Sequence, residues 1–431
     1  MIRLSCPVMA YAWGKLGADS AVASLKAAGD PGFLLEPAQP YAELWMGTHP
    51  KGMAMLAAGE KSLSRHLAEN PGAIGDKLAA VLQGKFNNEE GLGLPFLLKV
   101  LSVHKALSIQ VHPNKAEAEA LHAADPEHYP DPNHKPEMAI ALTPFELLCG
   151  FRPPAEILQQ IRETPELFEL VGGANFQRLE AAVNGGLAAD SAEAKEGLQA
   201  CFGSLMRQAG PLVERNVQSL TERLAFTLKR EAENENEASP AYLLAELIIR
   251  LNFSFPGDVG CLAPFFLNHF SLKPGEAAFL GPNEPHAYLY GDCVECMANS
   301  DNVIRAGLTP KFKDVDRLLK SLTYRMAGSE ENKFTASTDP QHAHITVYDP
   351  PIPEFVVHKL QEVEGVGKLE IPPLPTCSII LFAEGSGTVG EESVGRGGVF
   401  FLPAQVKILV NSSKPLTIFR AFTDVKDLDK I

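Results

Sequence analysis

The middle third of the chain has a helical sequence pattern, whereas both flanks have the short, punctuated runs of a β protein. Val213, Val217, Leu220, Leu224 and Leu228 recur at steps of four, three, four and four, the period of one helix face. ILQQIRETPELFELV and YLLAELIIRL also read as helices, and EAENENEASP, between Glu231 and Pro240, reads as a polar linker. The sequence therefore predicts an all-helical unit over residues 151–260.

Strand-like segments separated by Gly and Pro turns lie on both sides of this unit. PYAELWMGTHPKG and GLGLPFLLKVLSVHKALSIQVHP precede it, together with one helical run, DKLAAVLQGKF, and PGDVGCLAPFFLNHFSLKPGEAAFLGPNEPHAYL follows it. Because the second flank resumes the pattern of the first, we infer that the helices are inserted into one β domain, formed by residues 1–150 and 261–328. The turn signals of residues 329–431 are spaced roughly as in an all-β sandwich, which predicts a separate C-terminal domain.

Two segments of the chain resemble each other faintly. KPGEAAFLGPNEPHAYL and GRGGVFFLPAQVKILV both run from a Gly turn through a short apolar strand to a Pro turn and a second strand. Where the first has His286, the second has Val406 or Lys407, depending on one gap. If the two segments mark related halves, only the first can hold a metal.

The composition is that of an ordinary globular protein with an acidic balance. Of the 431 residues, 45% are hydrophobic, and the formal net charge is -15. This charge disfavours nucleic acids and anionic membranes as partners, although a local basic cluster can still bind a small anion. The N-terminus lacks an apolar signal core, and no apolar run is long enough to span a membrane. We expect a cytoplasmic monomer that acts on a small molecule.

The seven cysteines do not form an obvious framework. Their number is odd and they are spread thinly over the chain, which argues against a set of disulfides. Cys293 and Cys296 make one CxxC pair, but a structural zinc site needs a second pair of ligands, and none follows nearby. We therefore favour packed, reduced thiols, with half of a zinc site as the alternative.

Four residues in three segments have the chemistry of metal ligands. Gln110 and His112 are two apart in the strand-like LSIQVHP, so their side chains project from one face. Glu137 opens the apolar strand EMAIAL, where a buried carboxylate needs a cationic partner. His286 follows the Pro turn of PNEPHAYL, in a segment similar to the second motif of cupins. The alternative for His112 is that it is a histidine in a turn, and the alternative for Glu137 is that it is a surface glutamate at the start of a strand.

Basic residues lie close to these four along the chain. Lys99, Lys105 and Lys135 belong to the same β segment as the first three, and Arg305, Lys311 and Lys313 follow His286. Positive charge beside a metal suggests a bound oxyanion such as phosphate. The lysines can instead form a solvated face paired with Asp301, Asp314 and Asp316. That alternative is weaker for Arg305, which lies between apolar residues in VIRAGL.

Many motifs of the chain resemble those of one family, in order. YPDPNHKPEMAIAL is similar to the signature of the type I, zinc-dependent phosphomannose isomerases. The resemblance extends to YAWGK, PYAELWMGTHPKG, LPFLLKVLSV, LSIQVHPNK, LLCGFRP, PGDVGCLAPFFLN, LKPGEAAFLGPNEPHAYLYGDCVECMANSDNVIRAGLTPKFKDV, YDPPIPEF, GRGGVFFLPA and IFRAF. It is least specific in the helical middle. The resemblance implies a cupin-type double-stranded β-helix (jelly roll) that carries the site, an inserted helical domain and a second, C-terminal jelly roll without a metal site.

The resemblance also implies an activity and a set of site residues. The activity is the reversible isomerisation of mannose 6-phosphate and fructose 6-phosphate, which supplies mannose phosphates for GDP-mannose and glycan synthesis. Carried over position by position, the ligands of one Zn²⁺ ion fall on Gln110, His112, Glu137 and His286. Four residues are implied in catalysis: Arg305, Lys135, His134 and Glu295. Six more match substrate or pocket positions: Ser108, Lys99, Lys311, Trp13, Tyr288 and Asp301.

Moving the carbonyl from C1 to C2 of a sugar phosphate passes through an enediol, so negative charge develops on O1 and O2. A nearby cation stabilises that charge as a Lewis acid, and zinc adds no redox chemistry. Lys135 is a candidate base if burial beside a cation favours its neutral form, and Glu295 is a rival base. His134 is expected to assist ring opening, and Arg305 to share the charge stabilisation or to clamp the phosphate.

Two other classes of protein fit part of this pattern. Without Gln110, two histidines and one carboxylate make the facial set of the non-haem iron oxygenases, which zinc content and activity without oxygen would exclude. The second alternative is a sugar-binding or structural cupin without catalysis, which rests on analogy of fold alone. The ligand set and the basic residues around it argue for an enzyme.

Overall fold

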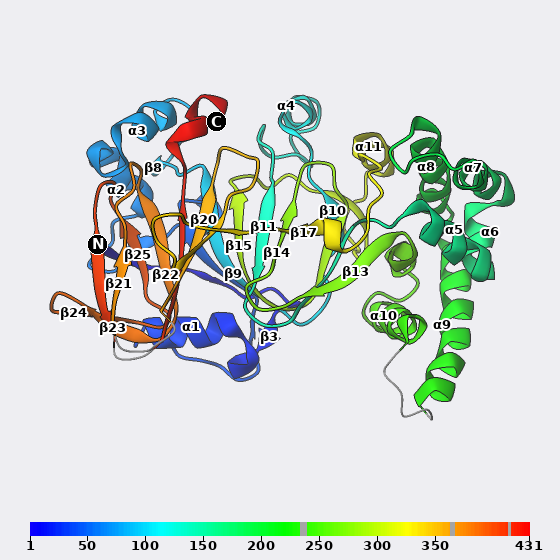
Figure 1. Cartoon of the computed structure of the whole chain (residues 1–431), viewed down its shortest axis with the longest axis horizontal. Helices are drawn as coiled ribbons and strands as arrows, with labels where there is room; N and C mark the ends of the chain where they lie inside the picture. The colour runs from blue at the N-terminus through cyan, green and yellow to red at the C-terminus, as the bar shows by residue number, and fades with distance from the viewer. Residues whose placement is uncertain (233–238, 363–366, 413–414) are drawn as a thin grey trace.

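The computed structural model describes residues 1–232, 239–362, 367–412 and 415–431. The chain is mainly β, with a block of helices at one end of the molecule and both chain termini in the other half (Figure 1). The helical block and the β-rich flanks are confirmed as predicted. The polar linker expected between Glu231 and Pro240 lies largely outside the described residues.

The larger sheet contains three of the four candidate ligands, and the fourth, His112, directly follows one of its strands. It has eleven strands: β2 (Val8–Met9), β5 (Glu43–Gly47), β9 (Phe96–Val103), β10 (Ile109–Val111), β11 (Glu137–Ala141), β12 (Phe145–Phe151), β13 (Leu267–Leu272), β14 (Ala277–Leu280), β15 (His286–Ala298), β16 (Ile304–Gly307) and β17 (Lys333–Phe334). β15 is thirteen residues long and pairs antiparallel with β9, β10, β11 and β12. It therefore links the segments on either side of the helical block.

The second large sheet joins the C-terminal region to the start of the chain. Its order is β18 (Ser337–Thr338), β19 (Ile345–Tyr348), β20 (Val356–Glu362), β27 (Leu416–Phe422), β22 (Ser378–Glu384), β25 (Val399–Leu402), β1 (Ile2–Ser5) and β6 (Met55–Leu56). β1 pairs antiparallel with β25, so the first strand of the chain belongs to the sheet of its last hundred residues. Smaller sheets are formed by β21 (Gly367–Ile371), β26 (Ile408–Ser412), β23 (Ser386–Val389) and β24 (Glu392–Gly395), by β3 (Lys15–Leu16) with β4 (Pro40–Tyr41), and by β7 (Asn87–Asn88) with β8 (Gly91–Leu92).

The period of two along each strand gives the larger sheet two different faces. Met138 and Cys296 pack on one face, in a hydrophobic core that also contains Phe355 and Ile379 from the C-terminal region. Ala139 and Cys293 pack on the opposite face, in a separate cluster. Cys293 and Cys296 therefore point away from each other, and all seven cysteines are buried and unpaired, as predicted.

The helical block consists of α5 (Pro154–Glu163), α6 (Pro165–Val171), α7 (Gly173–Asn184), α8 (Ala192–Met206), α9 (Gly210–Ala232) and α10 (Pro240–Ser254). Val213, Val217 and Leu220 of α9 are buried, as the periodicity predicts. The 3-10 helix η4 (Val259–Phe265) leads back to β13. The helices share one core with strand residues such as Ile109 and Ile304, which places the block against the β10–β16 end of the sheet.

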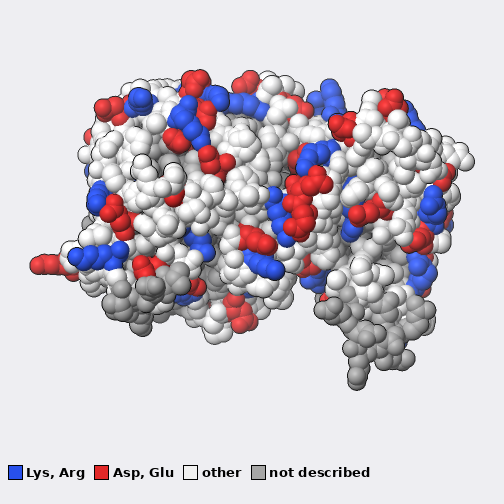
Figure 2. Space-filling model, in the orientation of Figure 1, with Lys and Arg blue, Asp and Glu red and all other residues white. Residues whose placement is uncertain are grey.

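Shorter helices surround the sheets: α1 (Ala21–Gly29), α2 (Leu63–Glu69), α3 (Asp76–Leu82), α4 (Lys115–Ala124) and α11 (Val315–Ser321), with 3-10 turns η1 (Gly17–Asp19), η2 (Pro50–Gly52), η3 (Pro71–Ala73), η5 (Glu330–Asn332) and η6 (Val425–Lys430). α3 confirms the helix predicted in DKLAAVLQGKF. In the described part of the chain, no helix has both the length and the apolar character needed to cross a membrane. Acidic and basic side chains are interspersed over the face shown in Figure 2.

Candidate metal centre

Three of the four predicted ligands meet at one point. His112 follows β10, Glu137 is the first residue of β11, and His286 is the first residue of β15. Nε2 of each histidine lies 3.5 Å from Oε2 of Glu137, and the possible ligand atoms all lie within 4.8 Å of one another. The side chains of both histidines are fully buried, and that of Glu137 is 2% exposed.

The far side of each imidazole determines which nitrogen faces the centre. Nδ1 of His112 donates a hydrogen bond to the backbone oxygen of Asn302 at 2.8 Å, and Nδ1 of His286 donates to that of Glu284 at 3.0 Å. With the proton on Nδ1, the lone pair of each ring lies on Nε2. Metal-binding histidines are commonly oriented by such a bond from the second nitrogen.

The three inner atoms have no other use within the described structure. Nε2 of His112, Nε2 of His286 and Oε2 of Glu137 are buried and make no hydrogen bond with any described residue. Such groups are rare in folded proteins, and each calls for an explanation. A cation bound by two neutral imidazoles and one carboxylate satisfies all three, and this donor set suits zinc.

Charges around the centre favour the ligand forms of these side chains. Burial lowers the pKa of His112 to about 4, although the nearby Glu137 charge opposes that change. Burial alone would raise the pKa of Glu137, but Lys135 and the two histidines hold it well below its ordinary value. The imidazole is therefore neutral and the carboxylate ionised near neutral pH, as metal binding requires.

Local hydrogen bonds hold the two histidine segments together. The backbone of Asn283, in the turn before His286, donates to the backbone oxygen of His112 at 2.8 Å. The side chain of Asn283 donates to Glu117 at 2.8 Å, and Glu117 forms a capping box with Asn114 at the start of α4. The helix that follows His112 and the turn that precedes His286 are thus fixed to each other.

Gln110, the fourth predicted ligand, lies beside this triad on β10. Its Cα pairs with those of His286 and Arg305 on the two neighbouring strands. The residue is half-buried and is two positions from His112, on the same face of the strand. Its role as a ligand stays a prediction.

A buried charge network lies next to the centre. Glu295 pairs with Ala139 across β15 and β11, which puts it on the same face of the sheet as Glu137. Its carboxylate lies 3.0 Å from Nζ of Lys99, which is also 3.6 Å from Glu43. Burial and the neighbouring Glu137 charge raise the pKa of Glu295, although Lys99 opposes the rise.

Glu43 was not among the residues predicted for the site. It lies in β5, its carboxylate accepts a hydrogen bond from the indole of Trp45, and it supplies the second negative charge on Lys99. Both residues lie in the motif PYAELWMG. The sequence feature that could have identified Glu43 is a glutamate within an otherwise apolar strand. Against the effect of burial, Glu295 and Glu43 keep the pKa of Lys99 above its ordinary value.

The two residues before Glu137 have different neighbours. Nζ of Lys135 lies 3.0 Å from Oε1 of Glu137, the carboxylate oxygen turned away from the histidines. Nε2 of His134 lies 2.5 Å from Oε1 of Glu354, in the C-terminal region. Both side chains were predicted to lie at the sugar, and Glu354 was not among the predicted residues.

Arg305, in β16, is a half-buried cation without a protein partner. Its guanidinium makes no hydrogen bond or ion pair with any residue that the structure describes. Burial lowers the pKa of Arg305 from its ordinary value. A guanidinium in this position is available for an anionic ligand.

The remaining predicted residues are more scattered. The Trp13 ring stacks on Tyr11, and Trp13 packs against the cluster that contains the buried Tyr288. Burial raises the pKa of Tyr288 well above its ordinary value, and the Glu295 charge adds to the rise. Ser108 is half-buried before β10, and Lys311 is exposed after β16.

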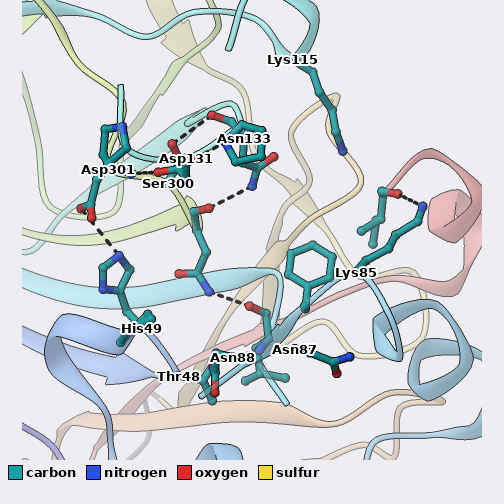
Figure 3. Close-up of a pocket in the computed structure, with 18 of the residues that line it drawn as sticks. Thr48, His49, Lys85, Asn87, Asn88, Lys115, Asp131, Asn133, Ser300 and Asp301 are labelled. Carbon is teal, nitrogen blue, oxygen red and sulfur yellow. Dashed lines mark hydrogen bonds and ion pairs between the residues drawn. The ribbon is translucent and has the colours of Figure 1, made fainter. Parts of the chain in front are cut away.

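Asp301 lines a cavity of about 850 Å³ beside the 130–133 loop (Figure 3). Its carboxylate lies 2.7 Å from Nζ of Lys51 and 3.6 Å from Nε2 of His49. The residues that line this cavity include Asn133 and Ser300 but none of the three metal-site residues. The cavity therefore adjoins the loop that leads to Glu137 without opening onto the inner atoms of the triad.

Together these features define a class of protein: a mainly β metal protein with a buried centre of two histidines and one carboxylate. Close to this centre lie two acid–base groups and an arginine that has no partner among the described residues. Residues 1–154 match the sequence model described as phosphomannose isomerase type I, catalytic domain, and residues 170–267 match the helical insertion domain of the same family. The chain belongs to the type I phosphomannose isomerase family.

Individual relatives agree over nearly the whole chain. The mannose-6-phosphate isomerase of Rattus norvegicus is 43% identical over 429 residues, covering 97% of each chain, and that of Homo sapiens is 42% identical over the same length and coverage. A crystal structure of mannose 6-phosphate isomerase bound with zinc and yttrium shows 28% identity and a TM-score of 0.78, over 99% of this chain and 100% of the other.

Proposed function

We propose that the chain catalyses the reversible isomerisation of D-mannose 6-phosphate and D-fructose 6-phosphate with one Zn²⁺ ion. The observation that carries this proposal is the triad of buried, unpartnered atoms on His112, Glu137 and His286. Similarity to mannose-6-phosphate isomerases over 97% of the chain supplies the substrate. The zinc-bound structure of a mannose 6-phosphate isomerase, similar over 98% of this chain, supports the choice of metal.

We assign the metal to His112, Glu137, His286 and Gln110. When bound, zinc supplies Lewis-acid stabilisation of the negative charge that develops on O1 and O2 of the sugar. Nδ1–H bonds to Asn302 and Glu284 hold the two imidazoles in the ligand tautomer. Because these partners are backbone oxygens, the orientation does not depend on further side chains.

The proton transfer needs one base and no outside reagent. The base removes the proton from C2 of open-chain mannose 6-phosphate and returns it to C1, while the O2 proton passes to O1. Lys135 and Glu295 are the two candidates. Burial raises the pKa of Glu295, which favours a carboxyl group able both to accept and to return a proton, while Lys135 lies closest to the proposed ligand Glu137.

Arg305 is proposed to bind the developing negative charge or the phosphate, because it is a cation without a partner in the described structure. Ser108, Lys99, Lys311, Trp13, Tyr288 and Asp301 are proposed to contact the substrate or to shape its pocket. Of these, Lys99 holds Glu295 and Glu43 in place. His134 is proposed to assist ring opening of the cyclic sugar.

The scaffold is proposed to be a cupin-type jelly roll, formed by residues 1–150 and 261–328, with residues 151–260 as the helical insertion and 329–431 as a second jelly roll without a metal site. Two strand pairs cross these boundaries: β1 joins the sheet of the C-terminal region, and β17 joins the larger sheet. We further propose a monomer that acts in the cytoplasm and supplies mannose phosphates for GDP-mannose and glycan synthesis. The seven unpaired cysteines suit a reducing compartment.

The decisive experiment is a coupled assay that follows fructose 6-phosphate formed from mannose 6-phosphate. Purified enzyme should be active, lose activity with a chelator, and regain it when Zn²⁺ is added back. Running the assay without oxygen separates this function from an iron-dependent oxygenase, because isomerisation consumes no oxygen. An inactive zinc-loaded protein would disprove the proposed function.

A further inference from the structure

The side chain of Glu354, in the C-terminal region, contacts the loop that leads to the metal-site residue Glu137. Its Oε1 lies 2.5 Å from Nε2 of His134, although the two residues are 220 positions apart. The Glu354 side chain is 1% exposed and that of His134 is 11% exposed. We propose that Glu354 is a positioning residue for the isomerisation, acting through His134 on the loop that delivers Lys135 and Glu137; this inference rests on the proposed function.

The contact is strong because neither side chain has another hydrogen-bond partner among the described residues. Oε2 of Glu354 makes no hydrogen bond with any described residue, so His134 is the only side chain that stabilises this buried carboxylate. A carboxylate accepts hydrogen bonds, so Nε2 of His134 carries the proton. Nδ1 makes no hydrogen bond within the described structure. Glu354 therefore determines both the direction of the ring and the nitrogen that remains free.

Glu354 is itself held on a rigid support. It follows Pro350, Pro351 and Pro353, whose rings restrict the backbone. Its backbone oxygen accepts a hydrogen bond from the hydroxyl of Thr423 at 2.8 Å. The next residue, Phe355, is fully buried in the core that the two large sheets share. The carboxylate is thus fixed relative to both sheets.

The other end of the loop is tied to the metal centre. Nδ2 of Asn302 donates to the backbone oxygens of Asp131 and Asn133 at 2.6 and 2.8 Å, and Oγ of Ser300 donates to Asn133 at 3.0 Å. The backbone oxygen of the same Asn302 accepts the Nδ1–H of His112. Between this anchor and Glu137, His134 is the one loop residue whose side chain is bound from the C-terminal region.

Displacement of His134 therefore moves the segment that carries Lys135. In the active sites of enzymes, a shift of about 1 Å can lower the rate by about 100-fold. The effect should appear in kcat more than in KM, since the loop positions a reacting group. A contact that only stabilises the fold would instead lower the melting temperature and leave kcat unchanged.

A double-mutant cycle on the zinc-loaded, full-length enzyme tests this inference. Glu354→Ala and His134→Ala should each lower kcat by about 10- to 100-fold with KM changed less than about threefold, and with zinc content retained. Because Glu354 acts through His134, the double variant should be no slower than the slower single variant. Glu354→Gln, whose amide oxygen can still accept the Nε2 proton, should keep more activity than Glu354→Ala.

Tyr348→Phe is the matched control, because it removes a hydrogen bond of the C-terminal region, from the Tyr348 hydroxyl to the backbone oxygen of Gly275, without changing Glu354 or its support. It should keep kcat within about twofold of the original enzyme even if the melting temperature falls. The inference is overturned if folded Glu354→Ala keeps full kcat, if Glu354→Gln is no more active than Glu354→Ala, or if the losses of the two single variants multiply in the double variant. An unmutated enzyme that fails to isomerise mannose 6-phosphate would disprove the proposed function instead.

Discussion

The ammonium group of Lys135 lies 3.0 Å from Oε1 of Glu137, on the side of that carboxylate opposite to the histidines. One carboxylate thus connects Lys135, one of the two candidate bases, to the proposed metal through its two oxygens. Only one residue separates the two positions, and Pro136 restricts Lys135 to an extended backbone. This arrangement brings a nitrogen donor next to the site where the sugar oxygens would meet the metal.

Replacement of Lys135 by Met should lower kcat by about 100- to 10,000-fold if Lys135 moves the proton. Zinc content should stay near one per chain, because the metal ligands are unchanged. Glu295→Gln is the companion variant, assayed with mannose 6-phosphate carrying deuterium at C2. The base is the residue whose loss leaves deuterium at C2 unexchanged; if both variants exchange it normally, neither is the base.

Changes to the metal-site residues should remove zinc and activity together. Glu137→Ala and His112→Ala each take one donor from a buried site and should lower activity more than about 100-fold, beyond the losses typical of residues that only support ligands. Zinc content measured by mass spectrometry checks the first effect. His269→Ala is a suitable control, since His269 pairs with Glu146. A metal-free but active variant would contradict the ligand assignment.

Arg305→Ala should retain both zinc and fold, because the guanidinium makes no hydrogen bond or ion pair with any described residue whose loss would destabilise the chain. Loss of its charge from the site should lower kcat/KM by about 100- to 1,000-fold. Arg305→Lys should recover part of this loss, since it restores the charge without the planar fork. If Arg305→Ala unfolds or loses zinc, its role is structural.

Local patterns were enough to predict much of the site. Each of the three metal-site residues lies at one end of a strand: His112 follows β10, and Glu137 and His286 begin β11 and β15. Alternating apolar residues and flanking prolines predict these strands, so each residue could be placed on an element. The helical block was equally clear, since Val213, Val217 and Leu220 repeat with the helix period and are buried. These features depend on residues close in sequence.

Features that depend on distant partners were not predictable in this way. Nothing in the strand Ile2–Ser5 indicates that it pairs with Val399–Leu402, because the period of two defines faces but not neighbours. The contact between His134 and Glu354 is of the same kind. Glu354 alone reads as an ordinary polar residue in a Pro-rich loop, and nothing near His134 in the sequence points to it as a partner. Only the packing of the two sheets brings the two residues together.

The last prediction concerns pH and the buried His358 of β20, far in sequence from the metal-site residues. Burial lowers the pKa of His358 to about 4, and the charge of Arg420, its neighbour across β20 and β27, adds to this. In the unfolded chain the pKa is that of an ordinary histidine, about 6.5. Between these values the unfolded state binds one more proton, so stability falls as pH falls from about 6.5 to about 4.

Replacement of His358 by Asn should therefore make the free energy of unfolding depend less on pH over this range. A shift of this size corresponds to about 3 kcal/mol between the two ends of the window, with little effect above about pH 7. Urea unfolding of the zinc-loaded protein at a series of pH values gives the free energy of unfolding against pH. The slope of this plot should correspond to about one proton fewer than in the unchanged chain. Gln361→Asn, at an exposed position of the same strand that carries no titratable group, should leave the slope between about pH 4 and 6.5 nearly unchanged. Equal slopes for the His358 variant and the unchanged chain would show that His358 takes up its proton without unfolding.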